Sequence, residues 1–306
     1  MSEKEIVNDW QSCLEIGWNC GHELLNPNQV HYCDYISLNP LLDLVLPHAS
    51  SAKRREFETP DEVQFVVVHQ IFELAFCLHQ YELRRVIQAL DGDDLELAVY
   101  LMKRIIQWTE MYSFLVRLLF TMTPGAFESF RELLKPASGA ESEAFRAIEL
   151  LSGIENDSVY AEDRDRQFSF REFLDRTPEQ GKSKPKARWW TENLSKIAKE
   201  ENLAQSFNSL LTRRKTNLIE VLTALDSFSD LRMLANLLYK YESVFIGFRR
   251  VHLFVVEYQI GQQGGTGHTS GALYLSSVIN RARFFPKLWE WKYAHQKIAG
   301  YKDEQP

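Results

Sequence analysis

The sequence predicts an all-α protein built as a large helical bundle. Long segments with apolar residues at helical spacing recur along the chain, and helix-capping residues precede several of them. Short alternating β-branched runs joined by hairpin turns are scarce. With 306 residues, of which 45% are hydrophobic, the chain is long enough to bury a sizeable core. We expect one helical domain over residues 1–306.

Composition excludes several classes of function. The formal net charge of −7, without a basic stripe, is not typical of a nucleic-acid-binding protein. Neither a signal peptide at the start nor a later apolar window of about 18 residues is found, so we expect a cytoplasmic protein without a membrane span. Four cysteines, none in a CxxC pair, predict reduced thiols: Cys13, Cys20, Cys33 and Cys77.

The clearest predicted helix begins after Thr59. Thr59 suits the N-cap, Pro60 the first helical position, and Glu62 completes a capping box at the positive end of the helix dipole. Helical residues continue to about Leu90, where Asp91-Gly92 ends the segment.

Further helices are predicted in order along the chain, with Thr123-Pro124 as the cap and first position of the second of them. Their approximate ranges are 95–121, 124–134, 141–151, a short one near 191, 203–225, 230–260 and 272–295. The charged stretch at about 156–188 is expected to be a surface excursion, with a short helix at 170–174.

A glycine-rich loop follows the longest predicted helix. Residues 261–271 contain five glycines, so their backbone can adopt positive φ and approach a ligand closely. A nucleotide-binding loop would follow a strand, whereas this one follows a helix, and it lacks the GK[ST] ending. We therefore expect a flexible loop whose backbone and Thr266 hydroxyl cover a small ligand.

Two histidines lie within apolar helical segments. His252 has Phe248 one turn before it and Val256 one turn after it, and His69 shares a helix face with Phe65. Spacing alone favours core histidines. The alternative is a metal or haem ligand for His252 and a rigidly held acid or base for His69.

A third candidate is the pair Phe127 and Arg131, one helical turn apart. An arginine covering Phe127 at the surface is one interpretation, and a bidentate clamp for a carboxylate is the other.

Taken together and in order, these segments resemble the tryptophan 2,3-dioxygenase family. The resemblance covers about Tyr32 to Phe285 and is weakest in the charged middle. Its motifs are Tyr32 to Leu38, Asp61-Glu62 with Phe65 to Gln70 and Glu73-Leu74, Phe127 to Arg131, Pro136 to Gly139 with Phe145-Arg146, Arg249 to Gly261, and Gly265 to Gly267 with Ser270-Gly271.

The resemblance implies a b-type haem between long helices, with His252 as the axial ligand of its iron and His69 on the distal side. It also implies that Arg131 holds a substrate carboxylate. Further substrate contacts implied in this way come from Thr266, Phe65, Phe127, Tyr32 and Tyr35, and the covering loop includes Gly265, Gly267 and His268. The Tyr32 to Leu38 segment of this family reaches into a neighbouring subunit's pocket, so a homotetramer is implied.

The implied reaction inserts O₂ into the indole ring of L-tryptophan or a close derivative and gives an N-formylkynurenine-type product. This chain departs from the family pattern at Ala75, Ala140, Glu141, Phe248 and His268. These departures leave open a monooxygenase that hydroxylates tyrosine, a substituted tryptophan or an indole. A helical haem-binding sensor without turnover is a further alternative.

Overall fold

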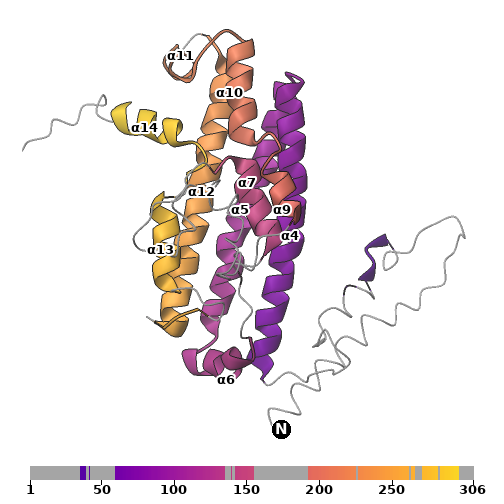
Figure 1. Ribbon diagram of the computed structural model, residues 1–306, viewed down its shortest axis with the longest axis vertical. Helices are drawn as coiled ribbons and strands as arrows, with labels where there is room; N and C mark the ends of the chain where they lie inside the picture. Colours follow the sequence, from indigo (N-terminus) through magenta and orange to yellow (C-terminus); the bar gives the residue numbers. More distant parts are fainter. Residues whose placement is uncertain are drawn as a thin grey trace, which may run out of the picture.

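Three long helices lie side by side at the centre of the protein (Figure 1). The computed structural model describes residues 35–38, 41, 59–134, 139, 142–154, 192–224, 227–261, 263–265, 271–281 and 283–295. Within these ranges every regular element is a helix, so the predicted all-α class is confirmed. The central helices are α4 (Pro60–Asp91), α5 (Leu95–Leu118) and α12 (Ser229–Ile260), and α5 packs against both of the others.

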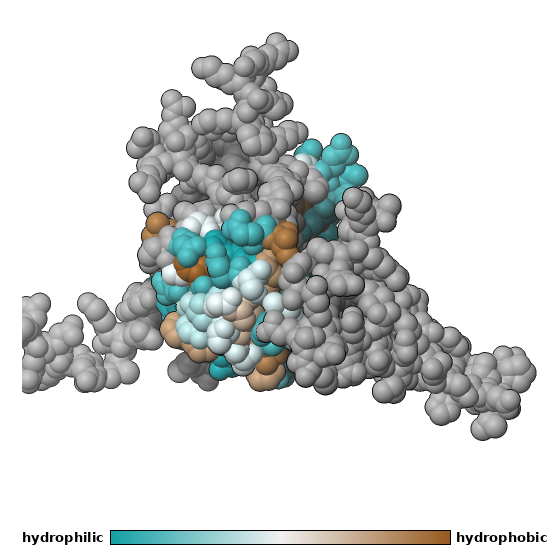
Figure 2. All heavy atoms as spheres, turned by 90° about the horizontal axis from the view of Figure 1, so that it is seen from below, coloured by the Kyte–Doolittle hydropathy of each residue, from teal (hydrophilic) through white to brown (hydrophobic). Residues whose placement is uncertain are grey.

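The shorter elements pack around these three helices. The 3₁₀ turn and α6 follow α5, α7 packs against α4, and α13 packs against α12. Their bounds are η1 (Leu119–Thr121), α6 (Pro124–Leu134), α7 (Glu143–Ser152), α9 (Glu192–Ile197), α10 (Leu203–Arg213), α11 (Leu218–Thr223), α13 (Ala272–Arg281) and α14 (Pro286–His295). Seen from the end that carries α6, the coloured surface mixes hydrophilic and hydrophobic residues (Figure 2).

The predicted helix starts at Thr59 and Thr123 are present. The amide of Glu62 donates to Thr59 Oγ1 over 3.3 Å, and Pro60 occupies the first helical position of α4. The amide of Ala126 donates to Thr123 Oγ1 over 3.2 Å at the start of α6. Each hydroxyl satisfies one of the amides that a helix start leaves unpaired.

The predicted helix at 203–225 is wrong, because the structure has two helices there. The chain leaves α10 through Lys215, which has a φ of 53°. Asn217 then caps α11, and its Oδ1 accepts a hydrogen bond of 3.0 Å from the amide of Glu220. This local cap competes with helix continuation, as asparagine side chains commonly do.

The predicted helix at 272–295 is also two helices, α13 and α14. The amides of Phe284 and Phe285 donate to the buried Glu242 carboxylate over 2.7 and 3.1 Å. These bonds to a distant side chain replace intrahelical ones, and Pro286 then begins α14.

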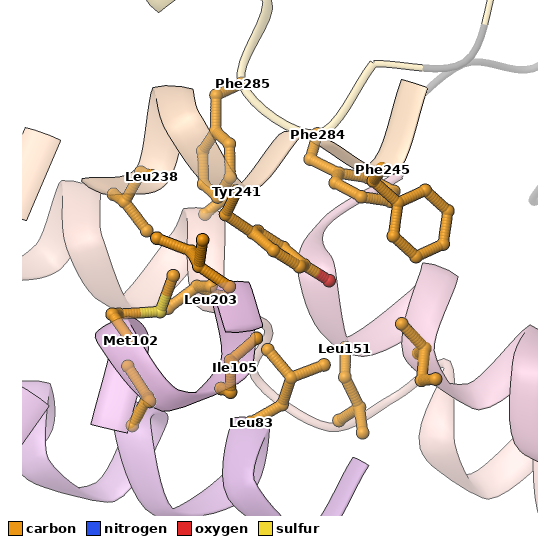
Figure 3. Close-up of a cluster of buried hydrophobic side chains, with 14 of the residues drawn as sticks. Leu83, Met102, Ile105, Leu151, Leu203, Leu238, Tyr241, Phe245, Phe284 and Phe285 are labelled. Carbon is orange, nitrogen blue, oxygen red and sulfur yellow. The ribbon is translucent and has the colours of Figure 1, made fainter. Parts of the chain in front are cut away.

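A polar cluster around His79 lies among aliphatic and aromatic side chains of the core. Tyr241 projects from α12 into this core (Figure 3), and its hydroxyl lies 2.7 Å from Ser152 Oγ and 3.1 Å from His79 Nε2. His79 Nδ1 lies 2.8 Å from the Tyr112 hydroxyl. Both ring nitrogens of His79 therefore have partners, and burial lowers its pKa to about 3.

Several predictions concern residues outside the described ranges. The expected excursion at 156–188, its short helix at 170–174, and Cys13, Cys20 and Cys33 are among them. Cys77 is described and is an exposed free thiol on α4. In the part of the chain that the structure covers, the helices are too short or too polar to cross a membrane.

Candidate active site

A cavity of about 280 Å³ lies between α4 and α12. Most of its wall is apolar, and α6, α7 and α13 also contribute side chains to it. The cavity brings together six residues that the sequence singles out, namely Phe65, His69, Phe127, Arg131, His252 and Gly265. Phe65 and Gly265, which are 200 positions apart in the chain, thus line the same cavity, and ligand pockets commonly lie between bundle helices in this way.

His252 faces this cavity from α12. Its ring stacks on that of Phe248, with centroids 6.0 Å apart and planes inclined by 14°. Its imidazole makes no hydrogen bond to any described residue. Burial lowers the pKa of His252 to about 4, and the neighbouring charge of His69 adds to this effect. The imidazole is therefore neutral near pH 7, which is the form that binds metals.

His69 faces the same cavity from α4. Its Nδ1 lies 2.7 Å from the carbonyl oxygen of Phe65, and the two rings are 4.1 Å apart. Because a carbonyl oxygen can only accept, Nδ1 carries the proton and Nε2 is left as an acceptor. Burial lowers the pKa of His69, and the hydrogen bond to Phe65 partly offsets that shift.

Aromatic rings surround the part of the cavity near His69. Phe65 lies 5.9 Å from Phe127 and 5.6 Å from Phe130, measured between ring centroids. Phe127 and Phe130 meet edge to face at 5.4 Å. Such an arrangement is suited to a flat apolar ligand.

Arg131 is buried, with only 5% of its surface exposed, so it is not the surface arginine that one interpretation of the sequence predicted. Its Nη1 donates to Gln263 Oε1, and its Nη2 donates to the carbonyl of Gly264. Nη1 also lies 3.3 Å from the Glu128 carboxylate. A buried guanidinium at the wall of an apolar cavity can bind an anionic group there.

The described ends of the glycine-rich loop meet beside Arg131. Gly271 has a φ of 59°, and a Cβ placed on it would lie 2.6 Å from the carbonyl oxygen of Gln263. Only glycine fits this position, because both the positive φ and the close approach exclude a side chain. Thr266, Gly267 and His268 lie between these ends, outside the described residues.

Comparison of the sequence with known proteins identifies the family. The sequence model of the family described as tryptophan 2,3-dioxygenase matches residues 17–205 and 187–293 of the chain. This chain belongs to that family.

Individual relatives are distant but matched over most of their length. A tryptophan 2,3-dioxygenase of Caulobacter vibrioides is 27% identical over 271 residues, covering 84% of this chain and 95% of the relative. One of Herpetosiphon aurantiacus is 28% identical over 84% of this chain and 95% of its own length. One of Burkholderia ambifaria is 29% identical, with 90% and 87% covered.

Sequence reasoning assigned no role to a charged cluster that this dioxygenase-family chain places at the cavity wall. Glu149 accepts from Arg146 Nη1 and from Arg249 Nη2, each over 2.6 Å, and all three side chains are buried. The i,i+3 spacing of Arg146 and Glu149 is visible in the sequence. The contact with Arg249, one hundred positions away, is not.

Gln259 also lines the cavity and was not singled out. Its Nε2 donates to the carbonyls of Leu119 and Met122 over 3.0 and 2.7 Å, which ties α12 to the end of α5.

The structure does not place the two predicted N-terminal tyrosines, Tyr32 and Tyr35, at the cavity. Tyr35 is 80% exposed and does not line the cavity, and Tyr32 lies outside the described ranges.

The residues present fit a haem. A porphyrin supplies four nitrogen ligands, so one neutral imidazole without another partner is the donor that the protein must add. His252 is such an imidazole among the described residues, and its surroundings are the apolar walls that a porphyrin face requires.

Proposed function

We propose that this protein is a haem-dependent dioxygenase that inserts O₂ into the indole ring of L-tryptophan or a close derivative, giving an N-formylkynurenine-type product. The observation that carries the proposal is one apolar cavity faced by His69, by the buried Arg131 and by a neutral His252 that makes no hydrogen bond to the described residues. Membership of the tryptophan 2,3-dioxygenase family supports it.

His252 would hold haem b through its iron. Ferrous haem, when bound, supplies the binding and activation of O₂. The protein's own contribution is a fixed imidazole on a long helix, stacked on Phe248, inside a pocket whose apolar walls exclude water.

Arg131 would orient the substrate by its carboxylate. A charge-assisted bond from a buried guanidinium fixes one end of the molecule, while Phe65 and Phe127 pack against the ring at the other end. The covering loop, with Gly265, Thr266, Gly267 and His268, would close over the amino acid. Tyr32 and Tyr35 of a neighbouring subunit would complete the pocket in a homotetramer.

His69 would accept a hydrogen bond from the indole N–H. Its Nδ1 proton is committed to the Phe65 carbonyl, so the free acceptor Nε2 has a fixed direction. Its lowered pKa keeps the ring neutral near pH 7 and thus able to accept that proton.

Labelled oxygen tests the proposal. Ferrous protein with L-tryptophan and ¹⁸O₂ is expected to give a product that contains two labelled atoms, because both atoms of one O₂ enter it. One labelled atom, or turnover only with peroxide, would reject dioxygenation in favour of a hydroxylase on the same scaffold. Binding of haem without any turnover of aromatic amino acids would instead favour a sensor.

A further inference from the structure

Three of the five N–H donors of the Arg131 guanidinium have partners among the described residues. Arginine has five N–H donors. Nη1 donates to Gln263 and Glu128, and Nη2 donates once, to Gly264. Nε–H and the second N–H of Nη2 make no hydrogen bond to the described residues. These two donors form a parallel fork of the kind that binds a carboxylate in a bidentate manner.

Gln263 contacts Nη1 of Arg131 from the base of the glycine-rich loop. Its side-chain oxygen must be the atom that faces Arg131, because a guanidinium only donates. Its own backbone carbonyl is packed against Gly271, which anchors this position at the point where the loop closes. Gln263 is exposed while Arg131 is buried, so the contact runs from the surface loop into the cavity wall.

We propose that Gln263 is a positioning residue for substrate recognition. By holding Nη1, it keeps Nε and Nη2 of Arg131, which lines the cavity, available to the carboxylate of an aromatic amino acid. The inference rests on the proposed function, since it takes Arg131 as the carboxylate-binding group.

The consequence is selectivity for aromatic amino acids over the corresponding amines. An arginine that must first be ordered loses rotamer entropy on binding, whereas one that is already held does not. Gln263 therefore favours ligands that have a carboxylate and contributes nothing to ligands that lack one. It also couples the bound carboxylate to the loop, because both contact the same guanidinium.

The test compares L-tryptophan with tryptamine, which has the same ring and amine but no carboxylate. Dissociation constants are measured by calorimetry on the ferric, haem-loaded protein without turnover. Gln263→Ala is expected to weaken tryptophan binding about tenfold, as for loss of one hydrogen bond to a charged group, and to leave tryptamine binding unchanged. Gln88→Ala, which removes an exposed glutamine near the far end of α4, is the matched control and should change neither constant.

Three outcomes for Gln263→Ala would overturn the inference. An unchanged tryptophan constant would mean that Gln263 does not position Arg131. Equal weakening of both ligands would mean that it only maintains the loop, and tighter tryptophan binding would mean that it competes with the carboxylate.

Arg131→Ala separates this inference from the proposed function. If that variant loses the preference for tryptophan while Gln263→Ala keeps it, the carboxylate site stands and the role of Gln263 is rejected. If the unaltered protein itself shows no preference for tryptophan over tryptamine, both are rejected.

Discussion

Two histidines of this protein have opposite surroundings. His79 lies in the core with both ring nitrogens hydrogen-bonded to tyrosine hydroxyls, whereas His252 lines a cavity and has no such bond to a described residue. Burial lowers both pKa values, to about 3 and about 4, so each ring is neutral near pH 7. Burial alone therefore does not distinguish a structural histidine from a ligand. The hydrogen bonds do, because both ring nitrogens of His79 have partners, whereas the imidazole of His252 makes no hydrogen bond to the described residues and can bind a ligand from the cavity.

The largest expected effect that tests this comparison is at His252. His252→Ala is expected to lose nearly all bound haem, because His69, the other described imidazole at the cavity, lies on α4 and not on the helix that would hold the iron. Haem content and the absorption spectrum of the purified variant measure this. A folded His252→Ala protein with full haem content and the original spectrum would reject the axial assignment.

Arg131 provides the next largest effect. Arg131→Ala is expected to keep haem but weaken binding of the amino acid by about 3–5 kcal/mol, as when one partner of a buried charged pair is removed. Arg84→Ala is a suitable control, since Arg84 forms a half-exposed ion pair with Glu200 at the surface. Such pairs contribute little. Equal affinities for both variants would show that Arg131 serves the loop alone.

His69 should behave unlike either of the first two residues. His69→Ala is expected to retain haem and to slow turnover by about 10²-fold, a typical loss for a positioned proton acceptor. Parallel measurement of haem content and turnover on His69→Ala and His252→Ala gives the contrast directly. Loss of haem from a folded His69→Ala protein would mean that His69 is needed to hold the haem iron, and the assignment of that role to His252 alone would be wrong.

Local sequence signals predicted the fold well where the stabilising contacts are local. The caps at Thr59 and Thr123 and the long helix ending at Gly261 depend on neighbours within one turn. The break at Phe284 and Phe285 was missed because its partner, Glu242, is more than 40 positions away in the sequence. A continuous aromatic-rich segment gives no sign of such a contact.

The candidate site, too, was predicted only where its contacts are local in the sequence. Residue spacing placed His69 beside Phe65 and left open whether Arg131 is at the surface. Burial of Arg131 depends on Gln263 and Gly264, 132 and 133 positions later in the chain. Only the resemblance to a family joined His69, Arg131 and His252 into one site before the structure brought them to one cavity.

The smallest expected effect concerns His79 and the pH dependence of folding. Its pKa is about 3 in the folded protein, against an ordinary value of 6.5. Below pH 6.5 His79 binds a proton in the unfolded chain but not in the folded protein. The stability from this group is therefore complete above pH 6.5 and is lost as the pH falls. The loss is about 1.4 kcal/mol per pH unit, or about 2 kcal/mol between pH 6.5 and 5.0.

His79→Leu isolates this contribution. The variant keeps the carboxylates, His69 and His252, so their effects on the pH dependence cancel when the two proteins are compared. Urea unfolding at pH 7.5 and 5.0 should show a free energy of unfolding that falls by about 2 kcal/mol less in the variant than in the unaltered protein. Its absolute stability should be lower at both pH values, because Tyr112 and Tyr241 each lose a hydrogen-bond partner. The same pH dependence in both proteins would mean that the folded protein does not lower the pKa of His79, and the distinction between a satisfied histidine and an available one would fail.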